Sequence, residues 1–149
     1  KSALAANTTA SNNTAVGNNA LGAATTGGNH TAVGAGALDA VTTVDSLTAF
    51  GYAALGSNTS GTGNVAVGAS AGAALTTGGG NTLIGANAGD SLTSGTTSVA
   101  IGSNAFGALT TADSNVAVGL LAGSATTHLL VVLQEMLLTM VVIMLLWVI

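Results

Sequence analysis

Seven glycines follow one another at intervals of 17 residues, with no variation in the spacing. They are Gly17, Gly34, Gly51, Gly68, Gly85, Gly102 and Gly119. A fixed period of this size is typical of architectures in which each repeat packs mainly on its two neighbours. We therefore predict that residues 1–127 form a stack of equivalent coils, and that residues 128–149, which break the pattern, are a separate segment. The function of such a stack resides in rows of side chains that recur along its axis.

Other positions of the repeat are nearly as constant as the glycine. The position three residues after it is always alanine, in the series Ala20, Ala37, Ala54, Ala71, Ala88, Ala105 and Ala122. The position just before it is always bulky and apolar, in the series Val16, Val33, Phe50, Val67, Ile84, Ile101 and Val118. Eight residues after it stands threonine, in the series Thr25, Thr42, Thr59, Thr76, Thr93, Thr110 and Thr127. Equivalent residues of stacked coils lie above one another, so the alanine series marks a place where no larger side chain fits.

The segments that lead into the glycines are short and rich in β-branched residues, which predicts strands of about four residues. In the segment Asn64-Val65-Ala66-Val67-Gly68 the two valines point to one face, and Asn64 and Ala66 point to the other. Both faces are partly apolar, so we expect one to fill the coil and the other to meet a second surface, most simply another chain. Thr-Thr-Gly pieces such as 25–27 supply turns. The predicted fold class is an all-β parallel β-roll or β-solenoid of 17-residue coils.

Composition narrows the functions open to this chain. Of its 149 residues only 4% are charged, and Lys1 is the single basic residue in a formal net charge of −4. This argues against a nucleic-acid partner, because neutralising phosphates requires Lys and Arg. Chains of low complexity can also be disordered, but disordered chains do not keep apolar residues at fixed places as this one does.

The repeat resembles those of two kinds of fibrous surface protein. The segments 13–17, 64–68 and 98–102, each followed by alanine three residues on, resemble the head repeats of trimeric autotransporter adhesins. The 17-residue spacing with Thr-Thr-Gly turns is similar to repeats of bacteriophage tail fibres. The resemblance implies a left-handed parallel β-roll that forms a homotrimer. It further implies a non-enzymatic, extracellular role as a rigid spacer or as an attachment surface for a host-cell or matrix receptor.

Few side chains are candidates for a site, and we expect no catalytic, cofactor-binding or metal-binding residue. His30 stands four residues before a glycine, where asparagine is commonest, so we expect it to fill a polar position of the stack. The aspartates of the array are Asp39, Asp45, Asp90 and Asp113. They do not form the repeated Gly-Gly-x-Gly-x-Asp pattern that binds calcium, and we expect solvated turns. Tyr52 is a weak candidate for a sugar or receptor contact, with a packing role as its alternative.

Two other functions stay open. The threonine series could form an ice-binding surface, although adjacent pairs such as Thr76 and Thr77 point in opposite directions and run into glycine turns. Alternatively, residues 129–149 could anchor the repeat in a membrane, since 21 residues are enough to cross a bilayer as a helix. Glu135 inside that stretch makes the second alternative costly.

We favour a different origin for residues 128–149, as a repeat read in a shifted frame. The codons of Met140-Val141 and of Trp147-Val148 must contain GGT, a glycine codon, in the frame that starts on their third base. The spacing of these glycines reproduces that of Gly95 and Gly102. On this interpretation the apolar segment was never selected for function. If it is ordered, its Leu and Met residues predict a helix.

Overall fold

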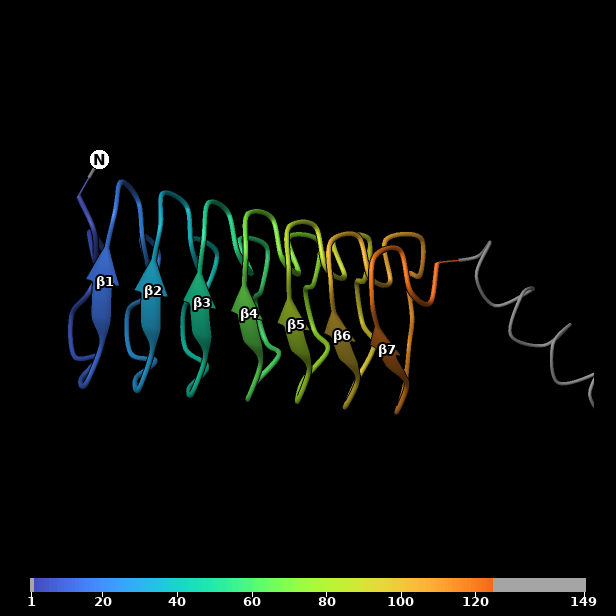
Figure 1. Cartoon of the computed structure of the whole chain (residues 1–149). Helices are drawn as coiled ribbons and strands as arrows, with labels where there is room; N and C mark the ends of the chain where they lie inside the picture. Colours follow the sequence, from blue (N-terminus) through green and yellow to red (C-terminus); the bar gives the residue numbers. More distant parts are fainter. Residues whose placement is uncertain (1, 125–149) are drawn as a thin grey trace, which may run out of the picture.

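The computed structural model describes residues 2–124 and shows a solenoid with one short strand in each coil (Figure 1). The strands lie side by side in chain order in one parallel sheet. Their bounds are β1 Thr14–Val16, β2 Thr31–Val33, β3 Thr48–Phe50, β4 Val65–Val67, β5 Thr82–Ile84, β6 Val99–Ile101 and β7 Val116–Val118. The described part of the chain contains no helix. The predicted all-β parallel solenoid is therefore confirmed.

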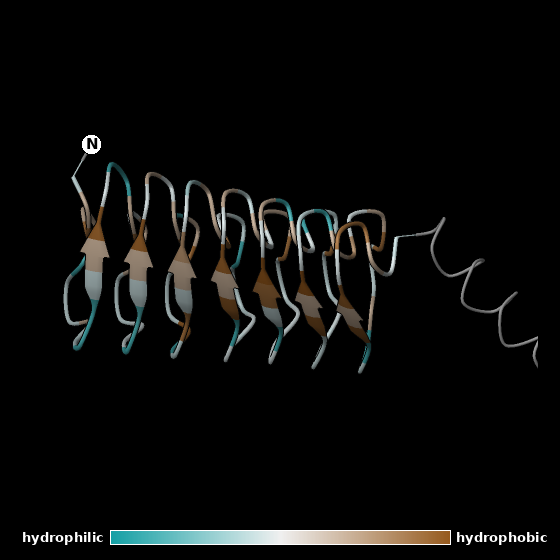
Figure 2. Ribbon diagram, viewed as in Figure 1, coloured by the Kyte–Doolittle hydropathy of each residue, from teal (hydrophilic) through white to brown (hydrophobic). Residues whose placement is uncertain are grey.

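The register of the sheet equals the period of the sequence. Thr14 pairs with Thr31, and Ala15 pairs with Ala32. The same offset joins every later pair of strands. Positions that recur in the sequence are therefore columns in space, and Figure 2 shows the most hydrophobic residue recurring at the arrowhead end of successive strands.

The glycine column is constant because the coils touch there through their backbones. Gly17 has a φ of 132°, which disfavours residues with a side chain. A Cβ added to it would lie 2.6 Å from the carbonyl carbon of Gly34 in the next coil. Both the backbone conformation and the lack of space therefore require glycine.

The alanine face of each strand points into the solenoid, and the bulky face points outward. The alanine series three residues after the glycine is fully buried from Ala20 to Ala105. The middle residue of each strand is also buried from β2 to β7, as Ala66 of β4 illustrates. In contrast, Val16 is 58% exposed and Phe50 is 55% exposed. The interior therefore consists largely of small side chains that let opposite walls of the coil approach closely.

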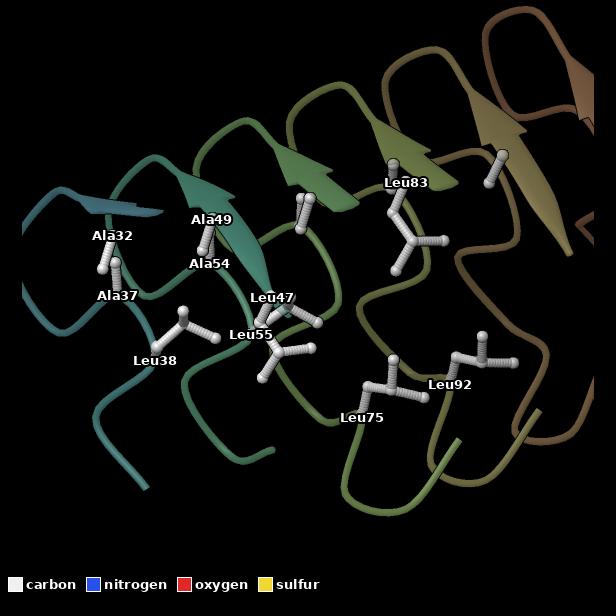
Figure 3. Close-up of a cluster of buried hydrophobic side chains, with 14 of the residues drawn as sticks. Ala32, Ala37, Leu38, Leu47, Ala49, Ala54, Leu55, Leu75, Leu83 and Leu92 are labelled. Atoms are coloured by element: carbon white, nitrogen blue, oxygen red, sulfur yellow. The ribbon is translucent and has the colours of Figure 1, made fainter. Parts of the chain in front are cut away.

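Most of the larger apolar side chains of the core come from two columns that the sequence analysis did not single out. The column four residues after the glycine supplies Leu21, Leu38, Leu55 and Phe106, and the column seven residues after it supplies Val41, Leu75 and Leu92. Figure 3 shows several of these leucines pointing between the walls. The first of these columns has a left-handed backbone, with φ of 54° at Leu38 and 62° at Gly89. The left-handed conformation recurs in each coil, whereas the residue at this position is leucine, phenylalanine or glycine.

Leu83 compensates for two of those glycines. It stands two residues before Gly85, where the other coils have alanine. A Cβ added at Gly72 would lie 2.7 Å from Cδ1 of Leu83, and one added at Gly89 would lie 2.9 Å from its Cδ2. The Leu83 side chain therefore fills the space that the glycines at 72 and 89 leave open, and core volume is shared between columns (Figure 3).

The predictions for the C-terminal segment concern residues outside the described part of the chain. They are the apolar helix, the membrane anchor and the frame-shifted repeat over residues 128–149. Within residues 2–124, no helix has the length and apolar character needed to span a membrane.

Candidate interaction face and internal columns

The outward face of the sheet is an uninterrupted strip of uncharged side chains, which we call the sheet face. Each strand contributes its first and third residues to it. The first residues are Thr14, Thr31, Thr48, Val65, Thr82, Val99 and Val116, and the third are Val16, Val33, Phe50, Val67, Ile84, Ile101 and Val118. All of these residues are exposed or half-buried. The third residues of the strands form a row of exposed or half-buried Val, Ile and Phe side chains, and contiguous exposed apolar patches are typical of interaction surfaces.

Charged side chains lie away from the sheet face, at turns where they join neighbouring coils. Asp45 and Asp113 both stand six residues before a glycine. Each accepts a hydrogen bond from the backbone N–H of the preceding coil, from Gly28 at 2.6 Å and from Thr96 at 2.9 Å. The hydroxyl of Thr96 also donates to Asp113, and these two hydrogen bonds from Thr96 lower the pKa of the Asp113 carboxyl. Asp45 and Asp113, for which we expected solvated turns, thus also form hydrogen bonds with the neighbouring coil.

Tyr52 lies just beyond β3 and is 67% exposed. Phe50, at the end of the same strand, is also exposed, so the two rings stand on either side of Gly51. The equivalent residues in the neighbouring coils are Ala35 and Ala69, which leave the Tyr52 ring room to project. Of the alternatives for Tyr52, its exposure favours a surface contact over packing.

A column of polar side chains runs inside the solenoid, four residues before each glycine. Asn64 is fully buried, and its Nδ2 donates to the carbonyl of Gly78 at 2.7 Å. Its Oδ1 accepts from the backbone N–H of Asn81 at 2.9 Å. Asn81 repeats both bonds with the following coil. Each side chain therefore satisfies one donor and one acceptor of the next coil, which explains why asparagine dominates this polar column.

His30 takes the place of asparagine in the polar column, as the sequence predicts. Its Nε2 lies 2.8 Å from the carbonyl oxygen of Val44, and its Nδ1 accepts from the backbone N–H of Leu47 at 3.2 Å. The ring must donate through one nitrogen and accept through the other, so only the neutral imidazole fits. Burial lowers the pKa of His30, although the hydrogen bond to Val44 and the charge of Asp45 act in the opposite direction.

This geometry makes stability depend on pH. The folded-state pKa of His30 is below the ordinary value of 6.5, so the unfolded chain binds more protons between these two values. We expect the free energy of unfolding to be unaffected above about pH 6.5 and to fall as the pH drops from there toward the folded-state pKa. Urea unfolding between pH 8 and 5 measures this slope.

His30→Asn is the matched variant for that measurement, because asparagine already serves at positions 13, 64 and 81. The variant should lose the slope in this pH range and keep its stability at pH 8. An unchanged slope in the variant would show that other groups, such as His128, cause the pH dependence.

The invariant threonines also form hydrogen bonds between neighbouring coils. The hydroxyl of Thr25 donates to the carbonyl of Thr42 at 3.1 Å, and the hydroxyl of Thr76 donates to that of Thr93 at 3.0 Å. The side chain and the backbone of this column thus both bond to the next coil, since the Thr25 N–H uses the same acceptor. Hydroxyl protons engaged in this way are not free to bind ice, which weakens the ice-binding interpretation of this column.

The described residues give no support for a metal centre. No cluster of three or more His, Cys, Asp or Glu side chains among residues 2–124 could hold a metal ion. Comparisons with family models, curated proteins and solved structures find no match to this chain. What the fold defines is a class, the tandem-repeat β-solenoids with one parallel sheet. The resemblance to adhesin heads and tail fibres rests on the repeat motifs alone.

Proposed function

We propose that this chain is a non-enzymatic structural segment of a surface adhesin or phage tail fibre, where it acts outside the cell as a rigid spacer or multivalent attachment surface. The observation that carries the proposal is the sheet face, an uncharged, apolar strip that extends along every described coil. An active site needs different side chains that converge on one point, whereas most positions of this chain repeat the same kind of side chain from coil to coil. Such a surface suits association with another elongated molecule along the axis of the solenoid.

The hydrogen bonds between coils support the role of spacer. Backbone bonds join neighbouring coils at the strands and at the turns, as in the bonds from Thr48 N–H to Asn64 and from Leu55 N–H to Ala71. The polar and threonine columns add side-chain bonds between the same coils. A stack tied together on every side resists bending, which a spacer requires.

The occupant we propose for the sheet face is a second and a third copy of this chain, in a homotrimer. Burying a strip of Val, Ile and Phe removes apolar area from water, and no charged group has to be desolvated with it. Identical copies provide identical strips of equal length. Three parallel copies would also present each exposed turn three times, which multiplies weak contacts with a receptor.

The test is a pair of lysine substitutions on the sheet face, Ile84→Lys with Ile101→Lys. These residues are 36% and 37% exposed in the single chain, so lysine can be accommodated in the monomer. We expect the parent to sediment as a trimer and the variant as a monomer, because association would have to bury two uncompensated charges per chain. Sedimentation velocity on the full chain measures this difference.

The matched control places the same charges on a turn, with Ser60→Lys and Ser94→Lys. Both serines are exposed and lie away from the sheet face. The control should remain a trimer. A parent that sediments as a monomer, or a sheet-face variant that remains trimeric, would contradict the proposed assembly.

One observation favours ice binding as a second candidate function, on the sheet face instead of the turn column. Threonines begin four of the described strands, at Thr14, Thr31, Thr48 and Thr82. Thr14, Thr31 and Thr48 stand on successive strands of the parallel sheet at a spacing of about 4.8 Å, and Thr82 follows after Val65. Thermal hysteresis that the sheet-face lysines abolish would promote this function over self-association. The membrane-anchored alternative depends on residues 129–149, outside the described part of the chain.

A further inference from the structure

The polar column is interrupted at Leu47. In the coil above it, Asn64 donates to the carbonyl 14 residues ahead and accepts from the N–H 17 residues ahead. Leucine can do neither, so the carbonyl of Gly61 accepts no hydrogen bond from this column, and the backbone N–H of Asn64 has no side-chain acceptor there. Both residues are buried. A buried backbone group without a partner costs about as much as a lost hydrogen bond, and most such groups bind protein or ordered water.

A third group without a hydrogen bond, the side-chain amide of Asn58, lies next to Gly61. Asn58 is fully buried in a column that is otherwise apolar at this level, between Val41 and Leu75. Neither Nδ2 nor Oδ1 of its amide forms a hydrogen bond with the protein. Its Nδ2 is 2.8 Å from the place where a Cβ of Gly61 would stand, so the amide lies against Gly61, whose carbonyl belongs to the interrupted step of the polar column.

The coil has in effect exchanged a polar and an apolar residue between two columns. The polar column carries Leu47, and the apolar column carries Asn58. The leucine belongs to the same buried core cluster as Leu55 (Figure 3). The asparagine retains an amide, but that amide stands in a different column and forms no hydrogen bond with the protein.

We propose that a buried water molecule binds between the Gly51 and Gly68 coils and completes this step. Its two protons would be donated to the carbonyl of Gly61 and to Oδ1 of Asn58. Its lone pairs would accept from the N–H of Asn64 and from Nδ2 of Asn58. Two donors and two acceptors match the capacity of one water, and buried waters in proteins typically make about three such bonds. The site is structural and independent of the function proposed above.

Water contacts at single amides test the proposal in the isotope-labelled full chain. We expect a water–amide cross-peak at the N–H of Asn64, with a residence time long enough to identify bound water. The N–H of Asn81 is the internal control, because Oδ1 of Asn64 already occupies it. No cross-peak at Asn64, or a crystal structure in which the Asn58 amide bonds directly to Gly61, would overturn the proposal.

The double variant L47N/N58L restores the residue type of both columns and should therefore remove the water site. Asparagine at position 47 can supply both bonds of the polar column, and leucine at position 58 matches Leu75 and Leu92. We expect the cross-peak at Asn64 to disappear and the thermal midpoint to rise by about 4 °C. The single variant N58L removes two of the four hydrogen-bonding partners of the water. It should therefore weaken the cross-peak at the N–H of Asn64. A cross-peak of unchanged strength in both variants would also overturn the assignment.

Discussion

Replacing Leu83 with alanine should lower the free energy of unfolding by about 3–5 kcal/mol, the upper part of the range for a buried leucine. The neighbouring side chains cannot close the space. The two nearest positions of the adjoining column are Gly72 and Gly89, which have no side chains with which to fill it. The variant would therefore contain a cavity lined on two sides by backbone, and the cost of a cavity increases with the volume that remains. Urea unfolding of the parent and the variant measures the loss.

A second substitution should recover more than half of that loss. In the variant L83A/G89L, the coil has alanine and leucine at the two positions, as the coil of Ala32 and Leu38 already does. The left-handed backbone at Gly89, with a φ of 62°, is the conformation that Leu38 adopts at 54°. The new leucine can therefore occupy the vacated space without a change in the backbone.

Two controls make this prediction specific. Leu120→Ala removes a leucine side chain from a position outside the sheet face, where it is 72% exposed, and should cost no more than about 0.5 kcal/mol. G89L without L83A should be strongly destabilising, because the new Cβ would lie 2.9 Å from Leu83. If L83A/G89L were as unstable as L83A, the two columns would not share the core volume.

The columns themselves were predictable, because a period without insertions determines which residues stand above one another. The pairing of Thr14 with Thr31 follows directly from the 17-residue spacing. The burial of the alanine series follows from its constancy, since a position that packs against its own copies above and below cannot vary alone. His30 in the polar column was also recognisable, because its column identified it before any contact was known.

The direction of the strand faces could not be predicted, because both faces are apolar. The bulkier residues, such as Val67 and Ile101, stand outside, and alanine stands inside. Hydrophobicity alone would place them the other way. What decides the direction is space: a coil of 17 residues that also holds Leu55 and Leu75 has little room for valine from the sheet.

The leucine columns were missed for a related physical reason. A core position is constant along the sequence only when every coil fills its own part of the core. Here one side chain can fill space in two coils. Leu83 fills the space next to Gly72 and Gly89, so the column four residues after the glycine reads as an irregular mixture of leucine and glycine. The exchange of Leu47 and Asn58 makes two further columns irregular in the sequence. Summing side-chain volume over each coil, instead of reading one position at a time, is the signal that would find them.

Replacing a residue of the alanine series with a larger one should destabilise the fold at least as much as creating a cavity in the core. In Ala71→Leu the new side chain would enter a column in which Ala54 and Ala88 stand directly below and above, all three fully buried. The backbone cannot withdraw, because the carbonyl of Ala71 accepts from Leu55 N–H at 3.0 Å and the adjoining Gly72 N–H donates to Ala88 at 2.9 Å. We expect a loss of at least about 3 kcal/mol, since overpacking usually costs 1–3 kcal/mol even where neighbours can shift.

The matched control for Ala71→Leu is Ala69→Leu, two residues earlier on the same turn. Ala69 is exposed, and its column already accepts Tyr52 and Leu120 in other coils. Its substitution should change the free energy of unfolding by no more than about 0.5 kcal/mol. Thermal unfolding of both variants, followed by circular dichroism, separates a steric effect of position from a general effect of adding leucine. If Ala71→Leu melted at the temperature of the parent, the alanines would not be in contact along the axis, and close stacking of small residues could not be what holds the solenoid together.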